Sequence, residues 1–130
     1  MKIWIEVLTP KQALFFEPLY RALKRKGHEA LITTRVYREA EQMLKLKKLR
    51  FSVVGSHGGG TAFGKLIASA ERITKLGNLI QKWKPNVAVS FSSVEASRVA
   101  FGLGIPHVAA NDSPHSWMVA RLTKIGRAHV

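Results

Sequence analysis

The sequence contains no cysteine. This absence excludes disulfide bonds, thiolate metal ligands and a cysteine nucleophile, and it fits a cytoplasmic protein. Long apolar runs are also missing: stretches such as Val99–Phe101 fall far short of the roughly 18 residues that cross a membrane. The first residues, Met1–Trp4, lead directly into an alternating strand pattern without the apolar segment of a secretory signal. We therefore expect a cytoplasmic protein.

Acidic residues are scarce, with 8 Asp and Glu against 21 Lys and Arg and a net charge of +13. Such an imbalance favours anionic partners, namely nucleotides, sugar phosphates or an acidic membrane surface, although a solvated basic surface explains it equally well. The sequence lacks an RNP-type aromatic motif and a basic block with interleaved aromatic residues. We expect no specific nucleic-acid partner, and association with an acidic membrane stays open.

Strand and helix patterns alternate along the chain. Strands are expected at 2–8, 29–33, 50–54, 87–91 and 105–110, with helices between them and a last helix from Ser113. The first helix is expected to begin near Leu14, which places Pro18 in or near its first turn. The clearest helix has apolar residues at three- and four-residue spacing, expected to lie on the sheet: Phe63, Leu66, Ile67, Ala70, Ile73, Leu76, Ile80 and Trp83. The alternation predicts an α/β fold with a Rossmann-like, doubly wound parallel sheet.

Ligands of open α/β sheets bind beyond the carboxyl ends of the strands, so the loops at those ends hold the candidate site residues. After the first strand, Lys11 and Gln12 lie at the start of a helix, where an anion can bind, although a plain loop is equally compatible. This loop lacks the G-x-G-x-x-G pattern of dinucleotide sites. We therefore expect no dinucleotide cofactor.

A glycine run follows the third strand. His57 precedes Gly58, Gly59 and Gly60, and Thr61 then opens the long helix. Main-chain N–H groups of such a run can converge on a phosphate with the helix dipole behind them, but the Lys-Ser/Thr pair of a Walker loop is missing. We predict that residues 57–61 bind phosphate or sugar, with a flexible turn as the alternative.

Two further loops complete the predicted edge. Ser92 and Glu95 have the spacing of a capping box, with ligand contact by Ser92 as a second interpretation. After the fifth strand, Asn111 is a predicted substrate contact, and Asp112 and His115 are predicted catalytic residues that transfer protons. Ser113 and Pro114 serve as the cap and first residue of the last helix. The chain offers no acidic metal cluster, so we expect neither a metal nor a bound cofactor.

Several short motifs occur in a fixed order and together resemble an archaeal family of unknown function within the GT-B glycosyltransferase group. These motifs are the Thr9–Pro10 exit from the first strand, Leu14–Pro18, Lys26–His28, His57–Gly59, Lys84–Ala88, Ala100–Pro106 and Asn111–His115. More distantly, the turn Lys26–Ala30 is similar to one in UDP-N-acetylglucosamine 2-epimerase and in the lipid-linked peptidoglycan GlcNAc transferase. The resemblance implies the N-terminal half of a two-domain GT-B fold, with the C-terminal domain missing from this chain.

The resemblance also implies a function. We expect a metal-independent glycosyltransferase-like enzyme in which this half supplies acceptor and phosphate contacts, while a nucleotide sugar is the substrate and the acceptor is unknown. A nucleotide-sugar 2-epimerase, which needs no acceptor, is the alternative enzyme. A non-catalytic subunit of a split GT-B glycosyltransferase is the alternative outside enzymes. This half alone is expected to be catalytically inactive.

The last residues form an unusual tail. Residues 125–130 (Ile-Gly-Arg-Ala-His-Val) are the translation of the start of a common sequencing-adapter oligonucleotide. We expect a domain at 1–124 that is truncated at its C-terminus, followed by an artefact at 125–130. Resequencing the genomic locus should therefore give a different codon series after Lys124. The same six codons in independent genomic DNA would show that the tail is natural.

Overall fold

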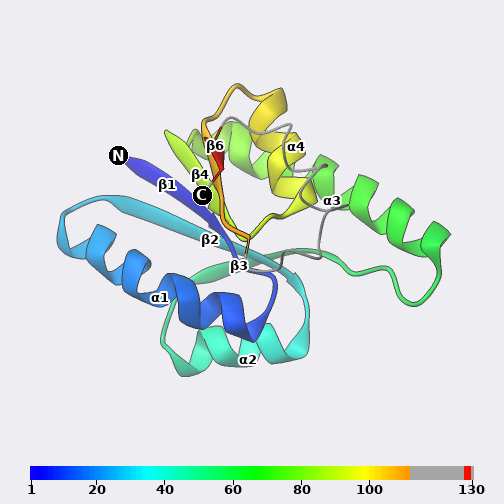
Figure 1. The fold of residues 1–130 in the computed structure, drawn as a ribbon, viewed down its shortest axis with the longest axis horizontal. Helices are drawn as coiled ribbons and strands as arrows, with labels where there is room; N and C mark the ends of the chain where they lie inside the picture. Colours follow the sequence, from blue (N-terminus) through cyan, green and yellow to red (C-terminus); the bar gives the residue numbers. More distant parts are fainter. Residues whose placement is uncertain (112–127, 130) are drawn as a thin grey trace.

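The computed structural model describes residues 1–111 and 128–129, and it forms a layered α/β domain (Figure 1). Asp112, His115 and the helix expected from Ser113 lie outside the described residues. The helices are α1 (Pro10–Arg25), α2 (Arg38–Leu46), α3 (Ala62–Trp83) and α4 (Val94–Gly102). The strands are β1 (Lys2–Glu6), β2 (Glu29–Val36), β3 (Phe51–Ser56), β4 (Val87–Ser90), β5 (His107–Ala109) and β6 (Ala128–His129).

All strands pair in parallel, in the order β3-β2-β1-β4-β5-β6. From β1 the chain runs outward through β2 to β3, and it then returns to place β4 on the other side of β1. This reversal makes the gap between β1 and β4 the switch point of a doubly wound sheet. The predicted Rossmann-like fold is confirmed.

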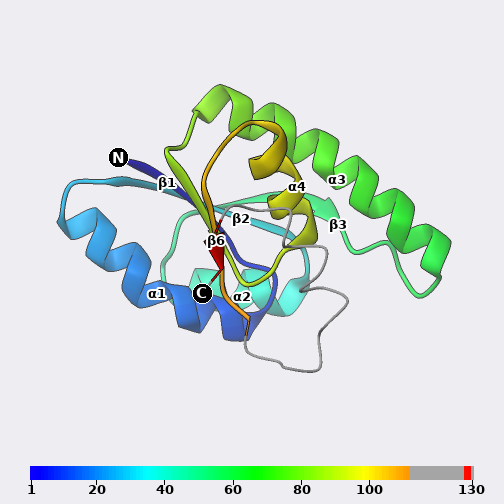
Figure 2. The same ribbon diagram turned by 45° about the horizontal axis from the view of Figure 1, so that its top comes forward.

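Alternate residues of β1 belong to the hydrophobic cores on the two faces of the sheet. Ile3 and Ile5 lie in one core cluster with residues of α1 and α2. Trp4 lies in a second cluster with residues of α3 and α4. Both views show these helix pairs on opposite sides of the strands (Figures 1 and 2). A central strand with buried residues on both faces is typical of a parallel sheet that helices cover on both sides.

The start of α1 differs from the sequence-based expectation. The helix begins at Pro10, and the Thr9 side chain caps it by accepting a hydrogen bond from the Gln12 N–H at 3.2 Å. Pro18 therefore lies inside the helix, and its expected place near the first turn is wrong. The Thr9–Pro10 pair is a cap followed by a proline at the first helical position, where the missing N–H removes no helical hydrogen bond.

The helix α3 extends past the sheet in both views (Figures 1 and 2). In its second half, Leu76 and Ile80 are buried as expected, whereas Phe63 and Leu66 near its start are 72% and 64% exposed. The prediction that the whole apolar stripe lies on the sheet is therefore wrong for the first half of the helix. The predicted end before Pro85 is confirmed, with Lys84 in the left-handed conformation.

The short strand β6 pairs with β5, with Val108 opposite Ala128 and Ala109 opposite His129. Strand pairing uses main-chain groups and does not depend on the identity of these side chains. The proposed origin of residues 125–130 therefore stays a prediction.

Gly58 has a packing role at the start of α3. Its φ is +91°, and a Cβ there would lie 2.5 Å from the Gly64 carbonyl oxygen and 2.7 Å from the Ala68 Cβ. Only glycine fits both this backbone conformation and this close approach. Gly60 differs, because its φ lies outside the left-handed region and a Cβ would meet no atom within 4 Å.

This contrast gives a stability prediction. Gly58→Ala should lower the free energy of unfolding by about 1–3 kcal/mol, because the strained φ and the clash with Gly64 add. Gly60→Ala is the matched control and should change it by less than about 0.5 kcal/mol. Denaturant unfolding of both variants measures the difference. Equal stability would show that the loop adapts and that Gly58 has no packing role.

Candidate functional site

The carboxyl edge of the sheet holds a group of buried polar side chains at the switch point. Glu6 ends β1 and lies opposite Ser90, which ends β4. Both residues are fully buried. Ligands of doubly wound folds bind at such a position. In this chain, protein side chains fill the buried part of it.

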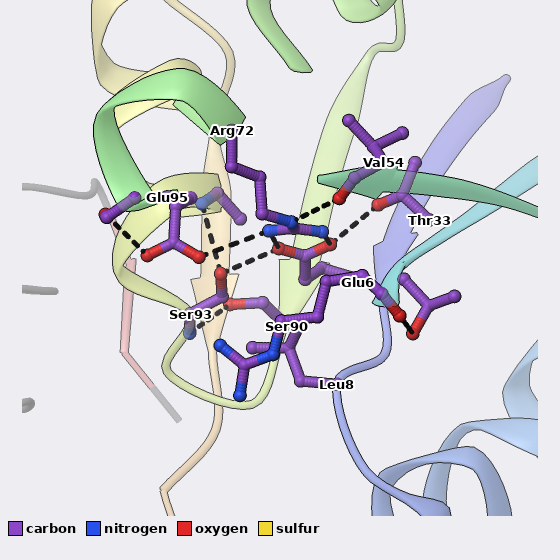
Figure 3. Close-up of polar contacts among 12 residues, drawn as sticks. Glu6, Leu8, Thr33, Val54, Arg72, Ser90, Ser93 and Glu95 are labelled. Carbon is purple, nitrogen blue, oxygen red and sulfur yellow. Dashed lines mark hydrogen bonds and ion pairs between the residues drawn. The ribbon is translucent and has the colours of Figure 1, made fainter. Parts of the chain in front are cut away.

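Arg72 lies at the centre of this group, reaching down from α3 between two carboxylates (Figure 3). Its guanidinium donates to Glu6 Oε1 at 2.7 Å and to Glu95 Oε1 at 3.3 Å, and its Nε donates to the Val54 carbonyl oxygen at 2.7 Å. The side chains of Arg72 and Glu6 are 0% and 1% exposed. The hydrogen bonds of Arg72 therefore link α3 to β1, β3 and α4.

Burial of the guanidinium acts to lower the pKa of Arg72, but the charge of Glu6 and its hydrogen bonds, together with Glu95, outweigh this and raise the pKa above its ordinary value. Two neutral donors add to the hydrogen bonds of the Glu6 carboxylate: the hydroxyls of Thr33 and Ser93 donate to it at 2.7 and 2.8 Å. We call Glu6, Thr33, Arg72, Ser93 and Glu95 the buried cluster. Each charged group in it has hydrogen-bonding partners, as buried charges need, and its one guanidinium is shared by two carboxylates.

Gly55 makes room for this arrangement. Its φ is +74°, and a Cβ at this position would lie 2.7 Å from Cγ of Arg72. The Arg72 side chain therefore crosses the surface of β3 where a side chain is missing. This close approach fixes the path by which the guanidinium reaches Glu6.

The start of α4 corrects one sequence-based expectation. Ser93, and not Ser92, caps the helix by accepting a hydrogen bond from the Ala96 N–H at 3.1 Å. Glu95 bonds to Arg72 and also accepts from the Ser69 hydroxyl at 3.0 Å. Ser92 has a φ of +58° and donates to the Ala110 carbonyl oxygen at 2.6 Å. The predicted capping box of Ser92 and Glu95 is wrong, because Ser93 occupies the cap position and Glu95 bonds to Arg72 and Ser69.

Two neighbouring hollows open beside the buried cluster. The first has a volume of about 170 Å³, and its lining comprises Arg35, Ser56, His57, Lys65, Ser69 and Glu95. The second has a volume of about 350 Å³ and is lined by Thr9, Arg35, Tyr37 and His57. Arg35 and His57 line both hollows. Glu95 belongs both to the buried cluster and to the lining of the first hollow, so the two features are in direct contact.

Among the predicted site residues that the structure describes, His57 is the one that lines the hollows. Gln12 has a local role, since its side-chain oxygen accepts from the Leu8 N–H at 2.8 Å. Thr61 caps α3 by accepting from the Gly64 N–H at 3.0 Å. Lys11 is exposed in the first turn of α1, and Asn111 is exposed two residues after β5.

The predicted glycine run is placed beside the hollows and not in their walls. Neither lining includes Gly58, Gly59 or Gly60. Gly58 packs on α3, whereas a Cβ at Gly59 or Gly60 would meet no atom within 4 Å. Phosphate binding by these glycines and Thr61 stays a prediction, as does ligand contact by Ser92.

Sequence reasoning missed the residues that contribute most to this site: Glu6, Arg35, Lys65, Arg72 and Glu95. Two of them had a signal. Arg72 falls four residues from both Ala68 and Leu76, in phase with the buried face of α3. Glu6 ends a strand whose central residues, Ile3–Ile5, are apolar and buried. A cation and an anion on two buried faces indicate a pair, although the sequence does not show that these faces meet.

In the described part of the chain, no group of three or more His, Asp or Glu residues is arranged to hold a metal ion. The described helices also include none long and apolar enough to cross a membrane.

Removing the cation from the buried cluster should be costly. Arg72→Leu leaves the Glu6 carboxylate buried without its ion pair, and we expect a loss of about 3–5 kcal/mol in the free energy of unfolding. The double variant Glu6→Leu with Arg72→Leu removes both charges and should recover part of that loss. Denaturant unfolding of the single and double variants measures this. A loss below about 1 kcal/mol for Arg72→Leu would mean that water or another cation reaches Glu6.

Solved structures with the same fold are numerous among GT-B enzymes. MurG of Acinetobacter baumannii matches 98% of this chain with a TM-score of 0.79 at 10% identity. UDP-GlcNAc 2-epimerase of Neisseria meningitidis, solved with UDP-GlcNAc bound, matches 97% with a TM-score of 0.77 at 15% identity. The Streptomyces sp. SF2575 glycosyltransferase SsfS6 matches 95% with a TM-score of 0.73 at 18% identity. The chain covers 40%, 39% and 43% of these structures, and the GT-B likeness of its fold is confirmed.

A curated relative is the uncharacterized protein MJ0665 of Methanocaldococcus jannaschii. It is 33% identical over 123 residues, which cover 95% of this chain and 36% of the relative, so the chain spans about a third of that protein. The predicted resemblance to an archaeal family of unknown function is confirmed. Residues 1–125 match the model of the family described as "Protein of unknown function (DUF354)", and the chain belongs to this family.

Proposed function

We propose that this chain is the N-terminal domain of a nucleotide-sugar-dependent glycosyltransferase, and that its carboxyl edge contacts the acceptor and phosphate groups. The fold supports a nucleotide-sugar-related role, since its structural neighbours are GT-B glycosyltransferases and epimerases. Fold alone does not define a reaction, so the proposal depends on the site.

The observation that carries the proposal is the charge of the hollows beside the switch point. Arg35 and Lys65 supply cations, and Ser69 and Glu95 supply groups that can bind sugar hydroxyls. A guanidinium and an ammonium are suited to phosphate oxygens. Substrates that combine phosphate with hydroxyl groups, as nucleotide sugars and sugar phosphates do, match this mixture.

Glycosyl transfer requires a proton acceptor for the attacking hydroxyl and stabilisation of the negative charge on the leaving group, and side chains at such an edge can supply both. The acceptor hydroxyl loses a proton as its oxygen attacks the anomeric carbon, and the departing nucleoside diphosphate carries negative charge. We assign stabilisation of that charge to cationic side chains, without a metal or bound cofactor. Asp112 and His115, which follow β5 in the sequence, are the proposed proton acceptors. Glu95 is held by Arg72 and Ser69, so we assign it the orientation of a hydroxyl group.

A nucleotide-sugar 2-epimerase is the second candidate. The fold matches the epimerase of Neisseria meningitidis with a TM-score of 0.77, so it is compatible with either enzyme. An epimerase changes its nucleotide sugar without an acceptor, whereas a transferase releases the nucleotide only when an acceptor takes the sugar. The products formed with and without an acceptor separate the two candidates.

The proposed proton transfer can be tested in the protein made from the complete genomic reading frame. Asp112→Ala or His115→Ala should lower turnover by about 10²-fold or more, because general base catalysis contributes about that much. The measurement is product formation from UDP-sugars, with circular dichroism to check folding. Gln42→Ala, at an exposed position of α2, is the control and should keep full turnover. Full turnover in both site variants would remove Asp112 and His115 from the mechanism.

A further inference from the structure

The strongest unexplained feature of the edge is Arg35 in β2. Its Nε is buried and has no hydrogen-bond partner in the structure, within the described residues. The printed ion pairs of the described part join other residues, and none includes Arg35. Leaving a buried guanidinium N–H without an acceptor is unfavourable, so the position favours a ligand that brings an acceptor oxygen.

Lys65 adds a second cation to the first hollow from a different element. It is exposed in the first turns of α3, and the ion pairs among residues 1–111 do not include it. The first turn of α3 also contains no acidic residue, so no side chain there offsets the positive end of the helix dipole. His57, directly after β3, lines the same hollow and adds a further hydrogen-bonding side chain.

The carboxylate in the wall of the first hollow does not neutralise these cations. Among the described residues of that lining, Glu95 is the only acidic one, and it is paired with Arg72 at 3.3 Å. Neither Arg35 nor Lys65 reaches it within the 4.0 Å of an ion pair, among the contacts of the described residues. The hollow therefore faces two cations that are not matched by a contacting carboxylate.

We propose that Arg35, His57 and Lys65 form a binding site for a phosphate group of the substrate, with Arg35 as its anchor. The Arg35 fork donates to two phosphate oxygens, and Lys65 contributes a point charge. Glu95 and Ser69, in the same lining, are placed to bind a hydroxyl next to that phosphate. The ligand class is a sugar or polyol phosphate, and the phosphate belongs either to the acceptor or to the nucleotide sugar. This inference rests on the proposed function for the source of the phosphate.

Calorimetric titration of the protein from the complete reading frame tests the site, with inorganic phosphate, N-acetylglucosamine 1-phosphate and UDP as separate probes. Arg35→Gln and Lys65→Gln should each weaken binding of the sugar phosphate by about tenfold or more, the loss expected when a charge-assisted hydrogen bond is removed. Arg35→Lys keeps the charge but loses the fork, and it should bind between wild type and Arg35→Gln. Arg25→Gln, at an exposed position in the last turn of α1, is the control and should bind as wild type.

The probes also separate this proposal from the proposed function. Loss of sugar-phosphate binding with UDP binding retained assigns the site to the acceptor phosphate, and loss of both assigns it to the nucleotide sugar. Sugar-phosphate binding by a protein that does not bind UDP would keep the site and contradict the nucleotide-sugar function. Wild-type affinity in both Arg35→Gln and Lys65→Gln would overturn the site. Since Lys65 is exposed, its variant gives a valid result even if Arg35→Gln fails to fold.

Discussion

The buried contact between Arg72 and Glu6 is the constraint on which the arrangement of this edge depends. It links the central strand to α3, and through Val54 and Glu95 it adds β3 and α4. A hydrophobic face tolerates small shifts of a helix, whereas a buried ion pair loses its geometry when the helix rotates or slides. Arg72 therefore fixes the position of α3 more tightly than Leu76 or Ile80 can. We attribute the precise placement of Lys65 and Ser69, on the same helix, to this contact.

The same constraint decides where a ligand can bind. In a doubly wound sheet the switch point is the expected binding position, but here Glu6, Arg72 and Ser93 fill its buried part. The hollows are therefore lined by the ends of β2 and β3, through Arg35, Ser56 and His57, and by the starts of helices. Local sequence motifs at the switch point, such as the loop with Lys11 and Gln12, are consequently less informative than residues on the neighbouring strands.

The sequence predicted those features that depend on one element at a time. Alternating strands, the apolar phase of α3 near Leu76 and Ile80, and the stop at Pro85 follow from local periodicity and turn chemistry. The Thr9–Pro10 pair is itself a helix-start signal of the kind that predicts a helix from Ser113 and Pro114, and it indicates the observed start of α1 better than the apolar periodicity does. The buried cluster was not predictable in this way, because Glu6 and Arg72 are 66 residues apart in the chain. The choice of Ser93 over Ser92 as cap likewise involves distant partners, since Ser93 also bonds to Glu6 and Ser92 bonds to the Ala110 carbonyl oxygen.

Glu95 shows why stability and binding must be separated when this edge is probed. Its carboxylate stabilises Arg72 and also lines the first hollow, so replacing it would disturb the fold and the proposed ligand contact together. Arg35 and Lys65 lie outside the buried cluster, and neither takes part in an ion pair among the described residues. A change in binding at these two positions therefore reports on the hollow itself. Two cations that form no ion pair with the described residues, beside a carboxylate that is already bonded to Arg72, are better explained by a ligand than by the stability of the domain.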